Sequence, residues 1–300
     1  MFVTGLVHNK NIIEAISDQF QIPCCYIHSN YYPDGEHVFH FDQPIKNKKL
    51  FLIFDLYPNI AQKCFELLCI LNFAKQSNCE IVLFTPYFPY LRESKKTYLQ
   101  VSSIDGFINH LNLLNVRKII TIDPHNTVFF KDQNFDILNI NPTPYFVQYF
   151  LSQNQTTPVL VAPDAGAHQQ ILVLAQQNKL PYILCEKQKS IKNIHIIQSY
   201  LCDKLSPKDF LILDDICDTA ETLILTQSLL NQFNPDSIHI WATHGLFTNA
   251  DNTMNLLDTL PGVLYSSDTV PKQISNSKIK NFSIRDIVID TLSKIKMDFN

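Results

Sequence analysis

The chain has 300 residues and a formal net charge of −4, with 46% hydrophobic and 17% charged residues. This length allows one large domain or two modest ones, and the hydrophobic content favours a sizeable core over wholesale disorder. No run of five like charges occurs, so the sequence argues against a nucleic-acid-binding tract and against a basic membrane-binding patch.

The sequence also argues against membrane insertion and secretion. The N-terminus lacks a basic start followed by a long apolar segment, so we expect no signal peptide. No window of about 18 uninterrupted apolar residues is present, so we expect no spanning helix. The eight cysteines form no Cys-x-x-Cys pair. Scattered cysteines in apolar runs indicate buried thiols in a reducing compartment, and we expect a cytoplasmic protein.

Strand-like and helix-like runs alternate along the chain. The stretch from Ile22 to Phe41 holds two β-rich pieces around a turn and predicts an antiparallel excursion. Further strands are predicted at Leu50–Phe54, Glu80–Phe84, Lys118–Ile122, Pro158–Ala162, Pro181–Leu184, Phe210–Leu213 and Ser237–Trp241. Helices are predicted at Ala61–Lys75, Ser102–Leu114, Ala167–Gln177 and Ala220–Gln232. This alternation is typical of an α/β fold with parallel sheets and helices on both faces.

Two places interrupt this rhythm. The first is Asn139–Tyr145, where Pro142 and Pro144 interrupt the start of a helical pattern. The second is the loop near Ser275–Asn281, which precedes a last helix from about Ser283. We therefore expect the main seam between two similar parts of the chain near residue 141.

The segment LILDDICDTAETL, Leu211 to Leu223, has the layout of a phosphate cradle. An apolar strand ends in Asp214 and Asp215, and an acidic and hydroxyl-rich loop leads into a helix. Backbone N–H groups at a helix N-terminus bind phosphate, and ligands of open α/β sheets lie at the carboxyl ends of strands. The paired carboxylates could accept hydrogen bonds from two neighbouring ribose hydroxyls. The alternative is a strand end followed by an ordinary helix cap.

Other predicted strands also end in chemically useful groups. Asp164, in the sequence PDAG, is suited to a metal ion or a sugar hydroxyl, or alternatively to a Pro-Asp turn. His125 follows a strand and is either a ligand or a packed residue. Lys187 and Lys189 could neutralise a transferring phosphoryl group, although a solvated pair of lysines is the simpler interpretation.

The segment from Phe84 to Lys96 combines aromatic and cationic residues. Tyr87, Phe88 and Tyr90 lead into Arg92. An aromatic face beside cations could hold an adenine and a triphosphate. The alternative is a solvated basic loop.

Taken in order, these segments resemble the successive motifs of the ribose-phosphate diphosphokinases, also called PRPP synthetases (PRPP is phosphoribosyl pyrophosphate). The matching motifs are YYPDGE (31–36), PYFPYLR (86–92), DPH (123–125), PDAG (163–166), EKQK (186–189), DDICDTAET (214–222) and ATHGLF (242–247). The resemblance implies an α/β fold of two phosphoribosyltransferase-like domains, each a mostly parallel sheet flanked by helices. Residues 1–141, completed by a C-terminal helix over 283–300, would form the ATP side, and residues 142–282 would carry the ribose-phosphate loop.

The resemblance also implies an activity: transfer of the β,γ-diphosphate of ATP to the anomeric hydroxyl of ribose 5-phosphate, giving PRPP and AMP with Mg²⁺. It implies a homo-oligomer with a dimeric catalytic unit. By motif, the ribose phosphate would contact Asp164, Asp214, Asp215, Asp218, Thr219, Ala220 and Thr222. ATP would contact Tyr32, Asp34, Glu36, Arg92 and Glu93; the metal would contact His125 and Asp164; and Lys187, Lys189 and His125 would be catalytic.

Several positions depart from the family pattern, including Ala167, where a second glycine is usual after PDAG. Glu93 places a charge where the family has an amide near ATP, Gln188 stands where an arginine is usual, and Glu221 replaces a glycine of the phosphate cradle. These departures leave two alternatives open. One is a related diphosphokinase with another ribose acceptor, such as ADP-ribose. The other is a catalytically silent regulatory homologue.

Overall fold

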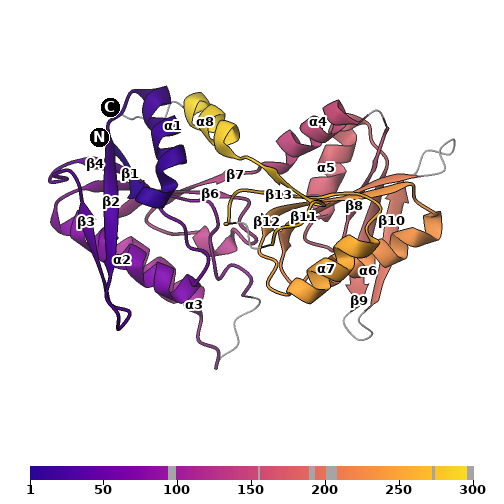
Figure 1. Cartoon of the computed structure of the whole chain (residues 1–300), viewed down its shortest axis with the longest axis horizontal. Coiled ribbons are helices and arrows are strands. Elements are labelled where there is room, and N and C mark those ends of the chain that lie inside the picture. The colour runs from indigo at the N-terminus through magenta and orange to yellow at the C-terminus, as the bar shows by residue number, and fades with distance from the viewer. Residues whose placement is uncertain (94–98, 155, 189–192, 201–207, 272–273, 296–300) are drawn as a thin grey trace. The chain divides into compact units, whose positions relative to one another are not determined.

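The computed structural model describes residues 1–93, 99–154, 156–188, 193–200, 208–271 and 274–295. These residues form two compact units (Figure 1). The first comprises Met1–Ile140 together with the C-terminal helix α8 (Arg285–Lys294), and the second comprises Asn141–Ile284. Each unit is built on one seven-stranded sheet of the described residues, mixed but mostly parallel.

The sheet of the first unit has the order β3-β2-β1-β4-β5-β6-β7. Strands β2 and β3 form an antiparallel hairpin, whereas the other neighbours are parallel. Helices α1 and α8 lie on one face and α2 and α3 on the other (Figure 1). The elements are β1 Phe2–Leu6, η1 Val7–Asn9, α1 Lys10–Phe20, β2 Cys24–Tyr31, β3 His37–Phe41, β4 Lys49–Ile53, α2 Ile60–Gln76, β5 Glu80–Thr85, α3 Ser103–Leu113, β6 Val116–Ile122, η2 Val128–Phe130 and β7 Asp136–Ile140.

The sheet of the second unit has the order β10-β9-β8-β11-β12-β13-β14, and only the pair of β9 and β10 is antiparallel among the described strands. Helices α4 and α5 lie on one face and α6 and α7 on the other (Figure 1). The elements are α4 Thr143–Gln153, β8 Val159–Ala162, α5 His168–Asn178, β9 Tyr182–Gln188, β10 Asn193–Tyr200, β11 Asp209–Cys217, α6 Glu221–Leu230, η3 Asn231–Phe233, β12 Ser237–Gly245, α7 Ala250–Thr259, β13 Leu264–Ser267 and β14 Ile279–Phe282.

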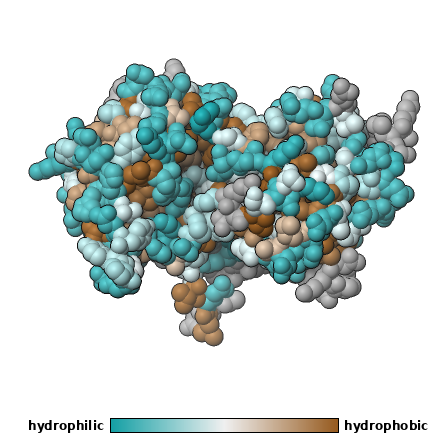
Figure 2. All heavy atoms as spheres, in the orientation of Figure 1, coloured by the Kyte–Doolittle hydropathy of each residue, from teal (hydrophilic) through white to brown (hydrophobic). Residues whose placement is uncertain are grey.

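The central strands are apolar because both of their faces are covered by helices. In β11, Phe210 to Leu213 are fully buried, and their side chains alternate between two hydrophobic clusters, one on each face of the sheet. Strand β8 is likewise buried along its length. On the face of the molecule shown in Figure 2, hydrophilic residues surround smaller hydrophobic patches. Continuous apolar strands of this kind position their polar neighbours at the strand ends.

The predicted α/β class is confirmed, and so is the antiparallel excursion, which is the hairpin of β2 and β3. Strands β1, β7, β10, β13 and β14 lie outside the predicted runs. In β1, Gly5 interrupts the β-rich pattern, but the fold requires it. A β-carbon at Gly5 would stand 2.6 Å from the carbonyl oxygen of Ile53 in the adjacent strand.

The first unit ends at Ile140 and the second begins at Asn141. Pro144 lies in the first turn of α4, where a missing N–H group costs no helical hydrogen bond. Among the helices of the described residues, none is both long enough and apolar enough to cross a bilayer.

Trp241 is the largest fully buried side chain of the described core. Its ring stacks on Phe146 with 4.2 Å between centroids, and its indole N–H donates to Thr143 Oγ1 at 3.0 Å. This contact joins strand β12 to helix α4.

We therefore expect Trp241→Ala to lower the free energy of unfolding by about 3–5 kcal/mol, because it leaves a large cavity. Trp241→Phe retains one aromatic ring but loses the N–H donor and part of the ring volume, so it leaves a smaller cavity and its loss should be smaller. Urea denaturation followed by circular dichroism measures both. Equal losses for the two variants would contradict the packing role of the ring.

Candidate active site

Three neighbouring parallel strands of the second unit bring predicted site residues to one edge of the sheet. Strands β9, β8 and β11 are adjacent in that order. Lys187 lies at the carboxyl end of β9, Asp164 follows β8 by two residues, and Asp214 and Asp215 lie near the end of β11. Because parallel strands end at the same edge, the fold brings Lys187 and these carboxylates to the edge of the sheet where ligands of α/β sheets bind.

The carboxyl group of Asp214 has a strongly raised pKa. Its side chain keeps partial solvent access, although protein atoms surround the carboxyl group closely. Burial raises the pKa of Asp214 well above its usual range, and repulsion from Asp215 and Asp164 raises it further. The backbone N–H of Asp215 donates to Asp214 Oδ1 at 3.0 Å and partly opposes this shift. The three carboxylates are therefore close enough to repel one another, and the site favours cations and hydroxyl donors.

Asp164 shapes the loop between β8 and α5. Its Oδ1 accepts the N–H of Gly166 at 2.9 Å, which is the turn that the sequence offered as an alternative to a ligand role. A carboxylate has two oxygens and can accept several hydrogen bonds. The turn therefore fixes the orientation of Asp164 and is compatible with a ligand role for its second oxygen.

The predicted phosphate cradle leads directly into helix α6. Ala220 is the N-cap residue of α6 and has a left-handed backbone with φ of 60°. Because alanine has no side-chain acceptor, α6 receives no side-chain cap from this position. Thr219 is exposed and Thr222 is half-buried in the first turn. The N-terminus of a helix attracts anions through its N–H groups and its dipole.

Asp218 is held in place by a residue that sequence reasoning missed. The Thr248 hydroxyl donates to Asp218 Oδ1, and the Thr248 N–H donates to the Asp218 carbonyl at 3.1 Å. Thr248 directly follows the ATHGLF motif. In that motif, His244 is buried and its Nδ1 contacts Thr269 Oγ1 at 2.8 Å. Thr248 therefore fixes the position of Asp218 in the loop of the predicted phosphate cradle.

Lys187 forms an ion pair with Glu221. The two side chains approach to 3.5 Å between Nζ and Oε2. This pair connects the predicted catalytic lysine with the residue that departs from the family pattern in the cradle. Lys189, the other predicted lysine, lies outside the described residues, as do residues 190–192.

In the first unit, the carboxyl ends of β1, β4 and β6 also carry polar groups. His125 is exposed three residues after β6. The preceding Asp123 has a positive φ of 41°, and its N–H donates to Asn139 Oδ1 and to the Ile140 carbonyl. Sequence reasoning missed a second pair on this edge, His8 and Asp55, with 3.3 Å between Nε2 and Oδ2. The position of Asp55 after an apolar strand was the available signal.

The predicted ATP residues Tyr32, Asp34 and Glu36 occupy the exposed tip of the β2–β3 hairpin. The Tyr32 N–H donates to the Glu36 carbonyl at 2.7 Å, and Asp34 Oδ1 accepts the Glu36 N–H at 3.0 Å. Gly35 has a φ of 92°, which only glycine adopts readily. The hairpin therefore presents polar and aromatic side chains on a tightly closed turn.

The predicted aromatic surface near Arg92 is wrong for two of its rings. Tyr87 and Phe88 are buried, and Phe88 packs against Phe107 and Phe130 with centroid distances of 5.7 and 5.1 Å. The hydrophobic core competes successfully for these rings, so they are not free to stack on adenine. Arg92 is exposed, as a nucleotide contact requires.

Glu93 has a structural role. Its Oε1 accepts the N–H groups of Ser103 and Ile104 at 2.8 and 3.2 Å, in the first turn of α3. The Ser102 hydroxyl accepts the next N–H group, from Asp105. The Glu93 carboxylate thus caps α3, which explains how a charge is accommodated where the family has an amide.

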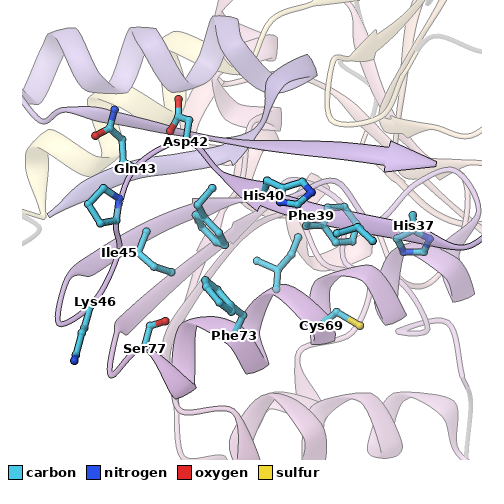
Figure 3. Close-up of a pocket in the computed structure, with 14 residues that line it drawn as sticks. His37, Phe39, His40, Asp42, Gln43, Ile45, Lys46, Cys69, Phe73 and Ser77 are labelled. Atoms are coloured by element: carbon cyan, nitrogen blue, oxygen red, sulfur yellow. The ribbon is translucent and has the colours of Figure 1, made fainter. Parts of the chain in front are cut away.

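A groove of about 730 Å³ lies between the edge strand β3 and helix α2 (Figure 3). Phe39, Ile45 and Phe73 face into it, and Phe73 stacks on Phe41 with 5.6 Å between centroids. The predicted site residues do not line it. The groove is therefore distinct from the strand ends that carry the motifs.

The acidic residues at the edge of the second unit offer oxygen ligands of the kind that Mg²⁺ binds. Within the described residues, no three His, Cys, Asp or Glu side chains are arranged as a complete metal site. Mg²⁺ prefers oxygen ligands and is usually held by one or two carboxylates, water and substrate phosphates. Crowded carboxylates with a raised pKa at Asp214 fit such a partial site. The residues present therefore suit a Mg²⁺ ion whose remaining ligands are water or phosphate oxygens.

Comparison with known proteins agrees with these motifs. Residues 1–108 match the N-terminal domain of ribose phosphate pyrophosphokinase. The ribose-phosphate pyrophosphokinase of Mycoplasma genitalium is 26% identical over 296 residues, covering 95% of this chain and 87% of that protein. The enzyme of the same name from Sulfurisphaera tokodaii is 26% identical over 293 residues, covering 94% and 98%. The chain is a distant member of the ribose-phosphate pyrophosphokinase family.

The fold of this family member agrees with a solved structure. The crystal structure of phosphoribosylpyrophosphate synthetase from Mycobacterium smegmatis matches with a TM-score of 0.84. The match covers 99% of this chain and 98% of that one at 17% identity. The predicted family and the predicted phosphoribosyltransferase-type fold are therefore confirmed.

The raised pKa of Asp214 makes the stability of the chain depend on pH. Because its pKa is raised, folded Asp214 holds a proton at pH values where the unfolded carboxyl, with a pKa of about 4, has lost it. Stability contributed by this group therefore falls as the pH rises above that value. Without Mg²⁺, Asp214→Asn should raise the free energy of unfolding by about 0.5–2 kcal/mol at pH 8, and by less at pH 5.

Asp236→Asn, an exposed substitution in the same unit, is the control and should change stability little at either pH. Urea denaturation at the two pH values makes the comparison. An Asp214→Asn variant no more stable than wild type at pH 8 would contradict the repulsion among the carboxylates.

Glu93 should contribute to stability through the hydrogen bonds that cap α3. Because its carboxylate caps α3, Glu93→Ala should lower the free energy of unfolding by about 0.5–2 kcal/mol, as the loss of a helix cap usually does. Glu80→Ala, at an exposed position of the same unit, serves as the control. Apparent ATP affinity should change less than threefold. Reduced ATP affinity with unchanged stability would instead support the nucleotide contact predicted from the motif.

Proposed function

We propose that the chain transfers the β,γ-diphosphate of ATP to the anomeric hydroxyl of ribose 5-phosphate, giving PRPP and AMP, in a Mg²⁺-dependent reaction. One observation carries this proposal. Lys187, Asp164 and Asp214 lie at or near the carboxyl ends of three adjacent strands, and the last of these strands, β11, leads into helix α6. Membership of the ribose-phosphate pyrophosphokinase family supports the same reaction.

The acceptor would bind along the edge of the second unit. Asp214 and Asp215 are adjacent acceptors for the ribose 2- and 3-hydroxyls, since a carboxylate accepts hydrogen bonds from hydroxyl donors. The 5-phosphate would lie at the N-terminus of α6, within the loop of Asp218 to Thr222. The acidic pair lies near the end of β11, and a short loop connects this strand to α6. This connection supports binding of the sugar and its phosphate at neighbouring positions.

The nucleotide contacts proposed from the motifs lie in the first unit. Arg92 is exposed and would contact ATP phosphates, and the hairpin tip with Tyr32, Asp34 and Glu36 would contact the adenine, in the neighbouring subunit's site of a homo-oligomer. His125 and Asp164 are the proposed protein ligands of Mg²⁺. The bound ion would neutralise phosphate oxygens of ATP.

In the reaction, the anomeric oxygen of ribose forms a bond to the β-phosphorus of ATP. The bond between that phosphorus and the oxygen of AMP breaks, AMP leaves with that oxygen, and the proton of the acceptor hydroxyl passes to solvent. Such transfers depend on positioning and charge neutralisation more than on covalent catalysis. The carboxylates orient the acceptor, and Lys187 supplies a cation beside them, with Lys189 proposed from the motif alone.

The activity is tested by incubating the protein with ATP, Mg²⁺ and a panel of acceptors that includes ribose 5-phosphate and ADP-ribose. Mass spectrometry identifies the products. AMP and PRPP should form with ribose 5-phosphate and not when Mg²⁺ is removed by chelation. A folded protein that yields no AMP with ribose 5-phosphate would overturn the proposal.

The role of Lys187 gives a sharper prediction. Lys187→Ala should lower kcat by about 100- to 1,000-fold, because it removes a charged donor that acts on the transition state. Lys131→Ala, at an exposed lysine of the first unit, should retain wild-type turnover. Initial rates of AMP formation compare the variants. A Lys187→Ala rate within threefold of wild type would show that this lysine has no catalytic role.

A further inference from the structure

Lys187 and Glu221 form an ion pair at the start of α6, where the acceptor phosphate is proposed to bind. Glu221 is the first residue of α6, and its carboxylate approaches Lys187 to 3.5 Å. The side chains are 36% and 50% exposed, so a ligand can reach both. The pair also spans two elements, the end of β9 and the start of α6.

Glu221 occupies a position that would otherwise favour anions strongly. The first turn of α6 carries the positive end of the helix dipole, and Lys187 adds a full positive charge beside it. The Glu221 carboxylate balances both. A phosphate bound at this helix end would meet a lysine that is already paired and a carboxylate of like charge.

We propose that Glu221 is a specificity-determining residue that disfavours an acceptor with a terminal phosphate dianion relative to one with an esterified, singly charged phosphate. This inference rests on the proposed function, since it assumes that the acceptor phosphate binds at the N-terminus of α6. The discrimination arises because repulsion by one carboxylate grows with the charge of the ligand.

Solvent exposure of Glu221 limits how strongly its carboxylate repels a bound phosphate. Solvent screens a half-exposed carboxylate, so its repulsion of a dianion corresponds to roughly fivefold in affinity. Repulsion of a monoanion in the same place is about half as large in free energy, which corresponds to roughly twofold. Removing the charge of Glu221 should therefore strengthen binding of the dianion more than binding of the monoanion.

The experiment measures dissociation constants by isothermal titration calorimetry at pH 8 with two probes. The first is ribose 5-phosphate, whose phosphate is a dianion well above its second pKa of about 6. The second is the 5-(methyl phosphate) of ribose, which carries a single charge. The proteins are wild type, Glu221→Gln and the control Asp251→Asn. Asp251 is an exposed acid in the first turn of another helix, α7, of the same unit.

In Glu221→Gln, affinity for ribose 5-phosphate should rise about fivefold and affinity for the methyl ester about twofold, so that their ratio changes by two- to threefold. Asp251→Asn should leave the ratio unchanged. An unchanged ratio in Glu221→Gln, or an equal change in Asp251→Asn, would overturn the inference.

AMP formation by the wild-type protein separates this inference from the proposed function. If AMP forms from ribose 5-phosphate but Glu221→Gln leaves the affinity ratio unchanged, the inference fails alone. If no AMP forms but the affinity ratio shifts as expected, the proposed function fails while the role of Glu221 at the phosphate site stands. Absence of binding of either probe to all three proteins would contradict both.

Discussion

The mutual repulsion of Asp164, Asp214 and Asp215 is the constraint on which the site of the second unit depends. Strands β8 and β11 are parallel neighbours, so their acidic ends meet at one edge of the sheet. The buried strands fix the backbone positions from which these side chains extend. The fold therefore keeps three carboxyl groups crowded together, an arrangement that is unfavourable while they are charged and favourable once hydroxyl donors or a divalent cation are present.

The surrounding structure limits this cost by fixing each acid through local contacts. Asp214 receives the N–H of its neighbour, Asp164 closes its own turn, and Asp218 is held by Thr248. Such contacts reduce the reorganisation needed when a ligand binds, which is the usual way that binding sites gain precision. Lys187 and Glu221 likewise restrain each other through their ion pair.

Much of the fold and the site could be predicted from the sequence, because apolar strands that end in acidic residues are local patterns. Asp164 follows β8 and Asp214 follows the apolar run of β11, and pairing of β8 with β11 brings them together. What the sequence did not reveal depends on tertiary contacts. Lys187 and Glu221 are 34 residues apart, and Asp218 and Thr248 are 30 apart. Core packing likewise buried Phe88, whose local pattern suggested a nucleotide surface.

The central claim is that the acceptor binds along the carboxyl edge of the second sheet, with its sugar hydroxyls at the acidic pair of β11 and its phosphate at the start of α6. A crystal structure of the protein with ribose 5-phosphate tests this claim most directly. The account predicts hydrogen bonds from two ribose hydroxyls to Asp214 and Asp215 and a phosphate within hydrogen-bond distance of backbone N–H groups between Thr219 and Thr222. A sugar phosphate bound elsewhere, such as in the groove beside β3, with this edge left to water, would contradict it.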